Sequence, residues 1–442
     1  MIDATRAPES TPQMSEKLLE KLDREHRELL RTCGRLATAR GECAYLVGGS
    51  VRDLVVGRQH DDLDIVIEGD GLAVAQALSR TIDGHLKRHH AFRTATVTTP
   101  GGLRLDVATA RKEEYPRPGQ LPQVVAGALD DDLMRRDFTI NTMAISLAAD
   151  DWGRFIDPLN GLTDLTAGRL RVMHSRSFAD DPTRVLRALR FASRFGYEIH
   201  PQTHGWLREA IVGGYLDRVS GDRVRKELRL TFSEAPIGGP LALQSDGVLA
   251  AVHPALRARE EDLSRLQQLL DGAAGLPAGM SSLGEASSWV LVLSCCAAAL
   301  SSLDRWQLVR RLHLSRHERA PLIDGGAAWR AAWTDIESAG AGATDSVRER
   351  ALRHLDPGAL LVAAVLAGAG SPAAKVVHQY FDELRWVRPW LGGTELQTLG
   401  VPEGPMIGEY LAKLRAARLD GIAETSDDER RLVAAWIAGD PG

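Results

Sequence analysis

The order of hydrophobic and polar residues changes near residue 177. Before it, short alternating or β-branched runs are separated by Gly- and Pro-rich turns, which is the pattern of strands. After it, apolar residues recur at three- and four-residue spacing, and the Ala- and Leu-rich remainder has a helical pattern. We therefore expect an α+β fold, in which a head with a mixed sheet precedes an all-α neck, body and tail. Strands are expected at 45–47, 63–67, 94–98 and 103–107.

The chain has 442 residues, a length that predicts several domains. We expect four parts, with boundaries set by the change of pattern. They are a helical N-terminal extension (1–40), the head (41–175), a helical neck (176–236) and a helical body with a tail (237–442).

The compartment is expected to be the cytoplasm, because no apolar segment follows a basic start at the N-terminus. The uncharged run 286–303 contains five serines and is barely long enough for a membrane span, so we interpret it as a buried helix. The four cysteines show no metal-binding spacing, and we expect reduced thiols. No membrane partner is predicted.

The formal net charge is -5, so the chain as a whole lacks the basic character of many nucleic-acid-binding proteins. The average hides a local difference. Residues 171–231 contain 12 Lys plus Arg and 7 Asp plus Glu, an excess of about five positive charges. A basic region of this kind suits a polyanionic substrate.

A first candidate site lies where the strand 45–47 ends in Gly48 and Gly49. Glycines at a strand-to-helix turn let backbone N–H groups approach a phosphate, and Arg52 would add a charge-assisted contact. The same turn also occurs where a strand simply leads into a helix. The glycines alone therefore leave both interpretations open.

The next expected strand begins with two acids, which are stronger evidence for a functional site than the glycines. Asp62 and Asp64 are two residues apart, so both carboxylates point to one face of the strand. A divalent cation would relieve their repulsion, and hard oxygen ligands suit Mg²⁺. If the strand bearing Asp106 lies beside them, three carboxylates converge, as two-metal phosphoryl or nucleotidyl transfer requires. The alternative for Asp106 is an outward polar residue on an alternating strand.

Arginines form the second and third candidate clusters. Arg135 and Arg136 precede apolar residues and so stand at the rim of a core, where they suit a polyphosphate clamp; Asn141 would bond a ribose or a phosphate. Further along, Asp181 and Pro182 suit the N-cap and first turn of a helix. On that helix Arg184, Arg187 and Arg190 recur every three residues, while Leu186, Leu189 and Phe191 would face the core. The simpler alternative for this helix is a capped helix with a solvated basic face.

Together these motifs resemble the class II nucleotidyltransferases of the polymerase-β superfamily, and within them the tRNA CCA-adding enzymes and bacterial poly(A) polymerases. Five signatures carry the resemblance, in the family's order, over residues 44 to about 232. They are Gly48–Asp53, Asp62–Asp64, Arg135–Asn141, Asp157–Leu165 and Asp181–Phe191.

The resemblance implies a metal-dependent enzyme that adds CCA to the 3′ end of tRNA from CTP and ATP. Residues matching Asp62 and Asp64 would hold Mg²⁺ while the RNA 3′-hydroxyl attacks the nucleotide α-phosphate and pyrophosphate leaves. Residues matching Asp181 and Arg184 would read the base edge in place of a nucleic-acid template. The remaining matches would bind the nucleotide or order its site; they are Gly48, Gly49, Arg52, Arg135, Arg136, Asp137, Asn141, Arg187 and Arg190. The body and tail would bind the tRNA.

The chain departs from the family pattern at two positions. Asp180 stands where the base-reading motif usually begins with Glu, and Thr142 stands where Ala often follows the Asn. Residues 111–125 lie where the family has a mobile loop involved in the change from C to A addition. The alternatives are an A-adding or CC-adding enzyme, a poly(A) polymerase, a small-molecule transferase, and an inactive RNA-binding protein. The intact Asp62, Asp64 and Arg52 argue against the last.

Overall fold

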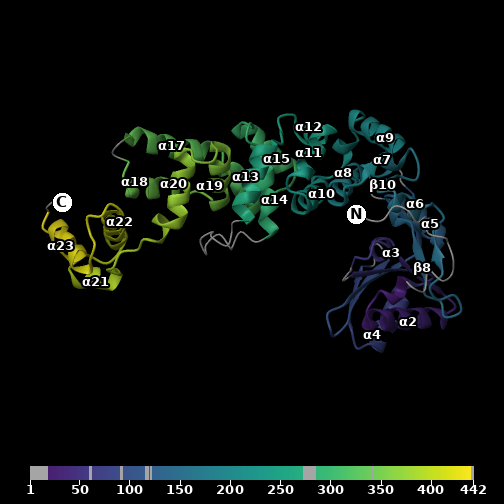
Figure 1. Cartoon of the computed structure of the whole chain (residues 1–442). Helices are drawn as coiled ribbons and strands as arrows, with labels where there is room; N and C mark the ends of the chain where they lie inside the picture. The colour runs from purple at the N-terminus through teal and green to yellow at the C-terminus, as the bar shows by residue number, and fades with distance from the viewer. Residues whose placement is uncertain are drawn as a thin grey trace. The chain divides into compact units, whose positions relative to one another are not determined.

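The computed structural model describes residues 18–58, 62–89, 93–114, 119, 122–271, 285–340 and 343–439. The chain forms two compact units, Met1–Ser220 and Gly221–Gly442. In Figure 1 all labelled strands belong to the purple-to-teal first unit, and the labelled elements of the green-to-yellow part are helices. The unit boundary lies inside the expected neck, and the four-part division stays a prediction. Residues 1–17 of the expected extension lie outside the described residues.

A seven-stranded mixed sheet forms the centre of the first unit, with strand order β3-β4-β5-β2-β1-β8-β9. The central pair β2–β5 is parallel and its other neighbours are antiparallel. All four expected strands are confirmed, as β1, β2, β4 and β5. The seven strands are β1 (Cys43–Val47), β2 (Asp62–Glu68), β3 (His85–His89), β4 (Thr94–Thr98), β5 (Arg104–Thr109), β8 (Ala144–Ser146) and β9 (Phe155–Ile156).

Two helices, α2 (Arg24–Thr38) and α4 (Gly71–Thr81), pack against each other and against the sheet. Every second side chain of a strand points to the other face of the sheet, where a hydrophobic cluster lies. Tyr45 and Val47 of β1 and Val66 of β2 pack there against Leu129 and Leu133 of the short helix α5 (Leu129–Met134). This second face positions the site, because Asp62 and Asp64 have the same parity on β2 as Val66.

Short elements surround the sheet and lead to the end of the unit. Strands β6 (Arg111–Glu114) and β7 (Gln123–Ala126) form a separate antiparallel hairpin, while β10 (Arg169–Leu170) and β11 (Glu198–Ile199) pair in parallel. The helices of this unit not yet named are α3 (Gly49–Val55), η2 (Thr139–Asn141), α6 (Gly161–Thr166), α7 (Ser177–Asp180), α8 (Thr183–Phe195), α9 (Pro201–Val212) and η3 (Tyr215–Arg218).

The second unit is helical throughout its described residues. The first part of the uncharged run 286–303 forms α14, in which residues from Trp289 to Cys296 are buried as predicted. The expected helix is shorter than the run, because α14 ends at Cys296 and Leu303 is exposed. Among the described residues, no helix combines the length and apolar character needed to cross a membrane. Its helices are α10 (Gly221–Glu234), α11 (Gly238–Ser245), α12 (Val248–Val252), α13 (Glu260–Asp271), α14 (Glu285–Cys296), α15 (Ser302–Arg311), α16 (Arg316–Asp324), α17 (Ala327–Ala339), α18 (Asp345–Leu352), α19 (Pro357–Ala367), α20 (Pro372–Asp382), η6 (Leu384–Trp386), α21 (Gly393–Thr398), α22 (Pro405–Leu419) and α23 (Ser426–Ile437).

Candidate active site

The predicted acids lie on one face of two neighbouring strands. Asp62 and Asp64 alternate along β2, and Asp106 of β5 is the register partner of Asp64 in the parallel pair. On the other side of β5, the hydroxyl of Thr96 donates to Oδ1 of Asp106 over 2.6 Å. The structure therefore places Asp64 and Asp106 side by side, and Thr96 fixes the orientation of the second carboxylate.

The guanidinium of Arg104 lies between Asp62 and Asp106. Arg104 lies 3.7 Å from Asp62 Oδ1 and 3.8 Å from Asp106 Oδ2, and the side chains of these two acids are 47% and 43% exposed. Within the described ranges, no three Asp, Glu, His or Cys side chains gather closely enough to hold a metal ion. The expected convergence is therefore a row of carboxylates rather than a closed cluster. These half-exposed carboxylate oxygens on adjacent strands are still the hard ligands that a divalent cation such as Mg²⁺ prefers.

The turn after β1 is tied to this acidic row. Gly48 has a φ of 68°, and a side chain there would collide with the guanidinium of Arg136. At the second residue of α3, the Ser50 hydroxyl accepts from the Asp64 backbone N–H at 2.9 Å and donates to the Asp62 carbonyl at 3.2 Å. The positive φ favours glycine at this position, and the Arg136 guanidinium beside it adds to the cost of any side chain.

The two adjacent arginines are held by a buried acid. Arg135 and Arg136 both donate to the carboxylate of Asp132, and Arg135 also donates to Glu113 of β6 at 3.1 Å. Burial alone would raise the pKa of Asp132, but the two guanidiniums outweigh it and the pKa lies below its usual range. The pair of arginines is thus fixed in place and stays next to an ionised carboxylate.

A second chain of contacts connects α3 with α8. Arg52 donates to Asp53 and to the Asn141 side-chain oxygen at 2.8 Å, and the Asn141 amide donates to Asp137 at 2.8 Å. Arg187 of α8 completes the chain by donating to Asp137 Oδ2 at 3.0 and 2.5 Å. Burial would raise the pKa of Asp137, but Arg187 and the Asn141 amide hold it well below its usual range. Arg52 is itself buried, as expected for a residue that holds neighbouring side chains in place.

The helix α8 begins one residue later than expected. Pro182 occupies the cap position, and Asp181 Oδ1 accepts from the backbone N–H and the hydroxyl of Thr183, at 3.0 and 2.7 Å. Arg184 donates to the Arg135 carbonyl at 2.5 Å. The Phe191 ring is buried as predicted, and the guanidinium of Arg190 lies 4.9 Å from its centre.

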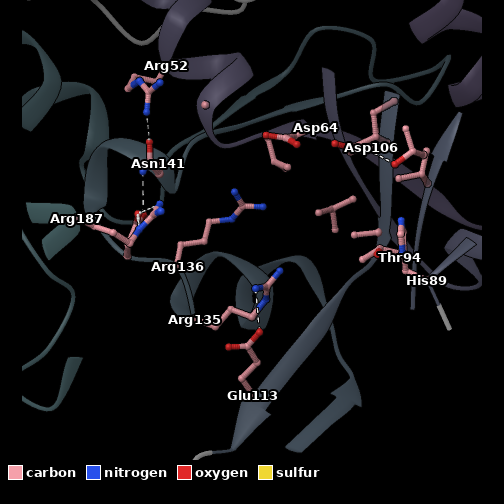
Figure 2. A pocket seen from close by; sticks show the side chains of 18 of the residues that line it. Arg52, Asp64, His89, Thr94, Asp106, Glu113, Arg135, Arg136, Asn141 and Arg187 are labelled. Atoms are coloured by element: carbon pink, nitrogen blue, oxygen red, sulfur yellow. Dashed lines mark hydrogen bonds and ion pairs between the residues drawn. The ribbon is translucent and has the colours of Figure 1, made fainter. Parts of the chain in front are cut away.

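Most of these side chains line an open cavity of about 840 Å³. Figure 2 shows Asp64 and Asp106 on one wall, with Arg136 reaching into the space from the opposite side. Three predicted site residues, Gly48, Asp62 and Arg190, are not among the residues that line it. The predicted residues that line the cavity are Gly49, Arg52, Asp64, Asp106, Arg135, Arg136, Asp137, Asn141, Asp181, Arg184 and Arg187.

Comparison with known proteins identifies the family. The sequence profile of the Poly A polymerase head domain matches residues 44–171, a range that contains the acidic row and both adjacent arginines. A CC-adding tRNA nucleotidyltransferase of Deinococcus radiodurans is 30% identical over 435 residues, which are 96% of this chain and 98% of that protein. The chain belongs to the class II tRNA nucleotidyltransferase family. The structure of the Thermotoga maritima CCA-adding enzyme complexed with tRNA matches with a TM-score of 0.77 at 29% identity, covering 96% of this chain and 98% of that one.

Another similar member of this family differs in length. An A-adding tRNA nucleotidyltransferase of Geobacter sulfurreducens is 35% identical over 412 residues, which are 92% of this chain and 46% of that protein. The chain thus spans about half the length of this relative. The head profile ends at residue 171, before Asp181 and the arginines of α8, although Asp181, Arg184 and Arg187 line the same cavity.

Sequence reasoning missed several residues that shape this class II site. Asp132 and Glu113 hold the adjacent arginines, Thr96 orients Asp106, and Arg104 lies between two acids. Their positions depend on the pairing of strands and on the packing of α5. The one available signal was the alternation in β4, which places Thr96 on the same face as Thr94 and Thr98.

Proposed function

We propose that this chain is a nucleotidyltransferase that adds CCA to the 3′ end of tRNA, using CTP and ATP. The observation that carries the proposal is a cavity with two kinds of wall, acids on the sheet and arginines that follow α5 or lie on α8. A triphosphate needs cations along its length, and transfer of its α-phosphate needs acids at one end. The tRNA substrate is supported by the names of the relatives and of the solved complex.

The reaction that we assign joins the RNA to the nucleotide and releases pyrophosphate. The RNA 3′-oxygen loses its proton and bonds to the α-phosphorus, while the bond from that phosphorus to the bridging oxygen of pyrophosphate breaks. Asp62 and Asp64 are the residues that would hold divalent metal, and Mg²⁺ is the ion we propose. When bound, such an ion polarises phosphoryl oxygens and lowers the pKa of a hydroxyl. Asp106, which accepts a hydrogen bond from Thr96, would accept the proton.

The other side chains bind and select the nucleotide. Arg135 and Arg136 would hold the β- and γ-phosphates, because their guanidiniums line the cavity opposite the acids. Asp181 and Arg184 would read the base edge, since both line the cavity at the start of α8. Gly49 would supply its backbone N–H. Asn141 and Arg187 would keep Asp137 and Arg52 in place through the contacts described above.

The helical second unit is the part we assign to tRNA. The complex with tRNA among the solved neighbours covers 96% of this chain, and so includes that unit. The proposed neck (176–236) would carry base selection, and the proposed body and tail (237–442) would hold the RNA.

An A-adding enzyme is the second candidate. The observation in its favour is that the A-adding relative is 35% identical over most of this chain, compared with 30% for the CC-adding relative. The charged segment 111–125 lies where the family has the loop involved in the change from C to A addition. Its residues 115–118, 120 and 121 lie outside the described ranges.

The test supplies tRNA transcripts that lack CCA, end in its first C, or end in both Cs, with each labelled nucleotide and Mg²⁺. Incorporation of two C and then one A supports the CCA assignment. Addition of A alone to the transcript ending in CC identifies an A-adding enzyme. Addition of C alone, or of unlimited A, would identify a CC-adding enzyme or a poly(A) polymerase and reject the proposal. An Asp64→Asn variant is the control for contaminating activity.

A further inference from the structure

Three consecutive aspartates, Asp130, Asp131 and Asp132, lie in the first turn of α5, and each has different surroundings. Asp130 is exposed to solvent. Asp131 accepts the Ala128 N–H at 3.0 Å and so satisfies the start of the helix. Asp132 has no exposed surface at all and lies on the same face of the helix as Leu129 and Leu133, which pack into the core. A carboxylate in that place requires partners, because an unpaired buried charge is costly.

The partners of Asp132 are both of the adjacent arginines, one on each oxygen. Oδ1 accepts from Nε and Nη2 of Arg135 at 2.9 and 2.6 Å. Oδ2 accepts from Nε and Nη2 of Arg136 at 3.2 and 2.8 Å. Each guanidinium thus presents its Nε–Nη2 edge to the same carboxylate. One buried side chain sets the orientation of both cations, and the forked geometry fixes the plane of each.

The edge of each arginine that Asp132 does not use is directed elsewhere. Nη1 of Arg135 donates to Glu113 of the β6–β7 hairpin at 3.1 Å. Nη1 of Arg136 lies against Gly48, where an added Cβ would also come within 3.9 Å of Asp64 Oδ2. Figure 2 shows both arginines extending into the cavity from the wall opposite Asp64. Asp132 therefore holds Arg136 close to the acidic row without letting the guanidinium turn onto it.

We propose that Asp132 is a positioning residue that holds Arg135 and Arg136 as one preformed clamp for the triphosphate. The inference rests on the proposed function in one respect, that the cavity accepts a nucleoside triphosphate. The physical reason is preorganisation. Arginine side chains lose much rotamer freedom on binding, and a clamp whose side chains are already ordered loses less when the ligand arrives. A guanidinium released from Asp132 would also have Asp64 as a competing partner.

The test compares the affinities of the full chain for ATP and AMP, measured by equilibrium binding without RNA. Asp132→Asn keeps the shape of the side chain but leaves a single acceptor oxygen, and its new NH₂ group faces one of the arginines. We expect the variant to bind ATP about tenfold or more weakly, since several charge-assisted bonds to phosphate are misplaced, and to bind AMP within about twofold of the unchanged chain. Asp130→Asn is the matched control, because its carboxylate is exposed on the same helix.

A second variant covers the case in which Asp132→Asn does not fold. Asp132→Glu retains the charge and the pairing but displaces both guanidiniums, so we expect the same selective loss of ATP affinity, to a smaller extent. Equal losses for ATP and AMP, or no loss for ATP in a folded Asp132→Asn or Asp132→Glu variant, would overturn the proposal. The two assignments fail separately. A chain that binds ATP through this clamp but transfers nothing to tRNA would refute the proposed function alone.

Discussion

The head of this protein contains two sets of aspartates that differ in their surroundings. On the sheet, the side chains of Asp62 and Asp106 are nearly half exposed and their nearest cation, Arg104, is 3.7 and 3.8 Å away. At the opposite wall, Asp132 and Asp137 are enclosed and accept hydrogen bonds from arginines at 2.5 to 3.2 Å. The first set is open to solvent, whereas the second set is bonded to guanidinium groups.

This difference separates acids that act on a ligand from acids that hold the protein's own cations. An exposed carboxylate in a weak ion pair can exchange its partner for a metal ion or a proton at little energetic cost. A buried carboxylate in a forked pair cannot, because removing either partner leaves a charge without compensation. We therefore expect substitutions in the first set to affect chemistry and substitutions in the second set to affect stability and nucleotide binding.

The largest expected effect is on nucleotide transfer, at the two acids of β2. Asp62→Asn and Asp64→Asn should each lower the rate of incorporation about a thousandfold or more, because several kcal/mol of transition-state stabilisation depends on the ion they would hold. Their melting temperatures should stay close to that of the unchanged chain. Single-turnover incorporation and thermal unfolding measure the two effects. Either variant retaining a tenth of the activity would remove that residue from the proposed chemistry.

A smaller effect is expected on stability in the enclosed set. Asp137→Ala should lower the free energy of unfolding by about 3 kcal/mol, because Arg187 and Asn141 lose a buried partner. Denaturant unfolding provides the measurement, and Asp106→Ala is the matched control from the exposed set. Similar losses in the two variants would erase the distinction between the sets.

The stability that Asp137 contributes should depend on pH. The pKa of Asp137 is depressed in the folded chain, so its contribution is present above the unfolded pKa of about 4 and disappears as the pH falls toward the folded value. Urea unfolding between pH 5 and 2.5 should therefore show a shallower loss of stability in Asp137→Asn than in the unchanged chain. Parallel curves would indicate that Asp137 keeps its ordinary pKa.

The smallest effect is expected at Arg104. Its ion pairs with Asp62 and Asp106 are long and half exposed, so Arg104→Gln should change the free energy of unfolding by about 0.5 kcal/mol or less. The same urea titration measures it. A loss above about 2 kcal/mol would place Arg104 with the tightly paired groups instead.

Local patterns were enough to predict the parts of the site that are close in sequence. Alternation placed Asp62 and Asp64 on one face of β2, and the break after residue 177 marked the change to helices. The sequence alone did not predict that Asp106 lies beside Asp64, because only the pairing of β2 with β5 brings the two together. The predicted start of α8 was wrong by one residue, because the helix begins at Thr183 rather than Pro182. The backbone N–H of Thr183 donates to the Asp181 carboxylate.

Contacts between distant elements were beyond sequence reasoning. Three aspartates precede the adjacent arginines, and nothing local tells which one is buried; the packing of Leu129 and Leu133 decides in favour of Asp132. Glu113 meets Arg135 only because the β6–β7 hairpin folds beside α5. The basic face predicted for α8 is largely enclosed, since Arg184 and Arg190 are buried.

The most direct test of the central claim counts the pyrophosphate released for each nucleotide joined to RNA. The measurement uses the unchanged chain, tRNA lacking its CCA end, CTP and ATP. It is repeated with a tRNA that ends in a 3′-deoxynucleotide. Transfer to the 3′-hydroxyl in the cavity predicts one pyrophosphate per nucleotide with the first tRNA and none with the second. Pyrophosphate release that is indifferent to the 3′-hydroxyl, or absent with both RNAs, would contradict the assignment.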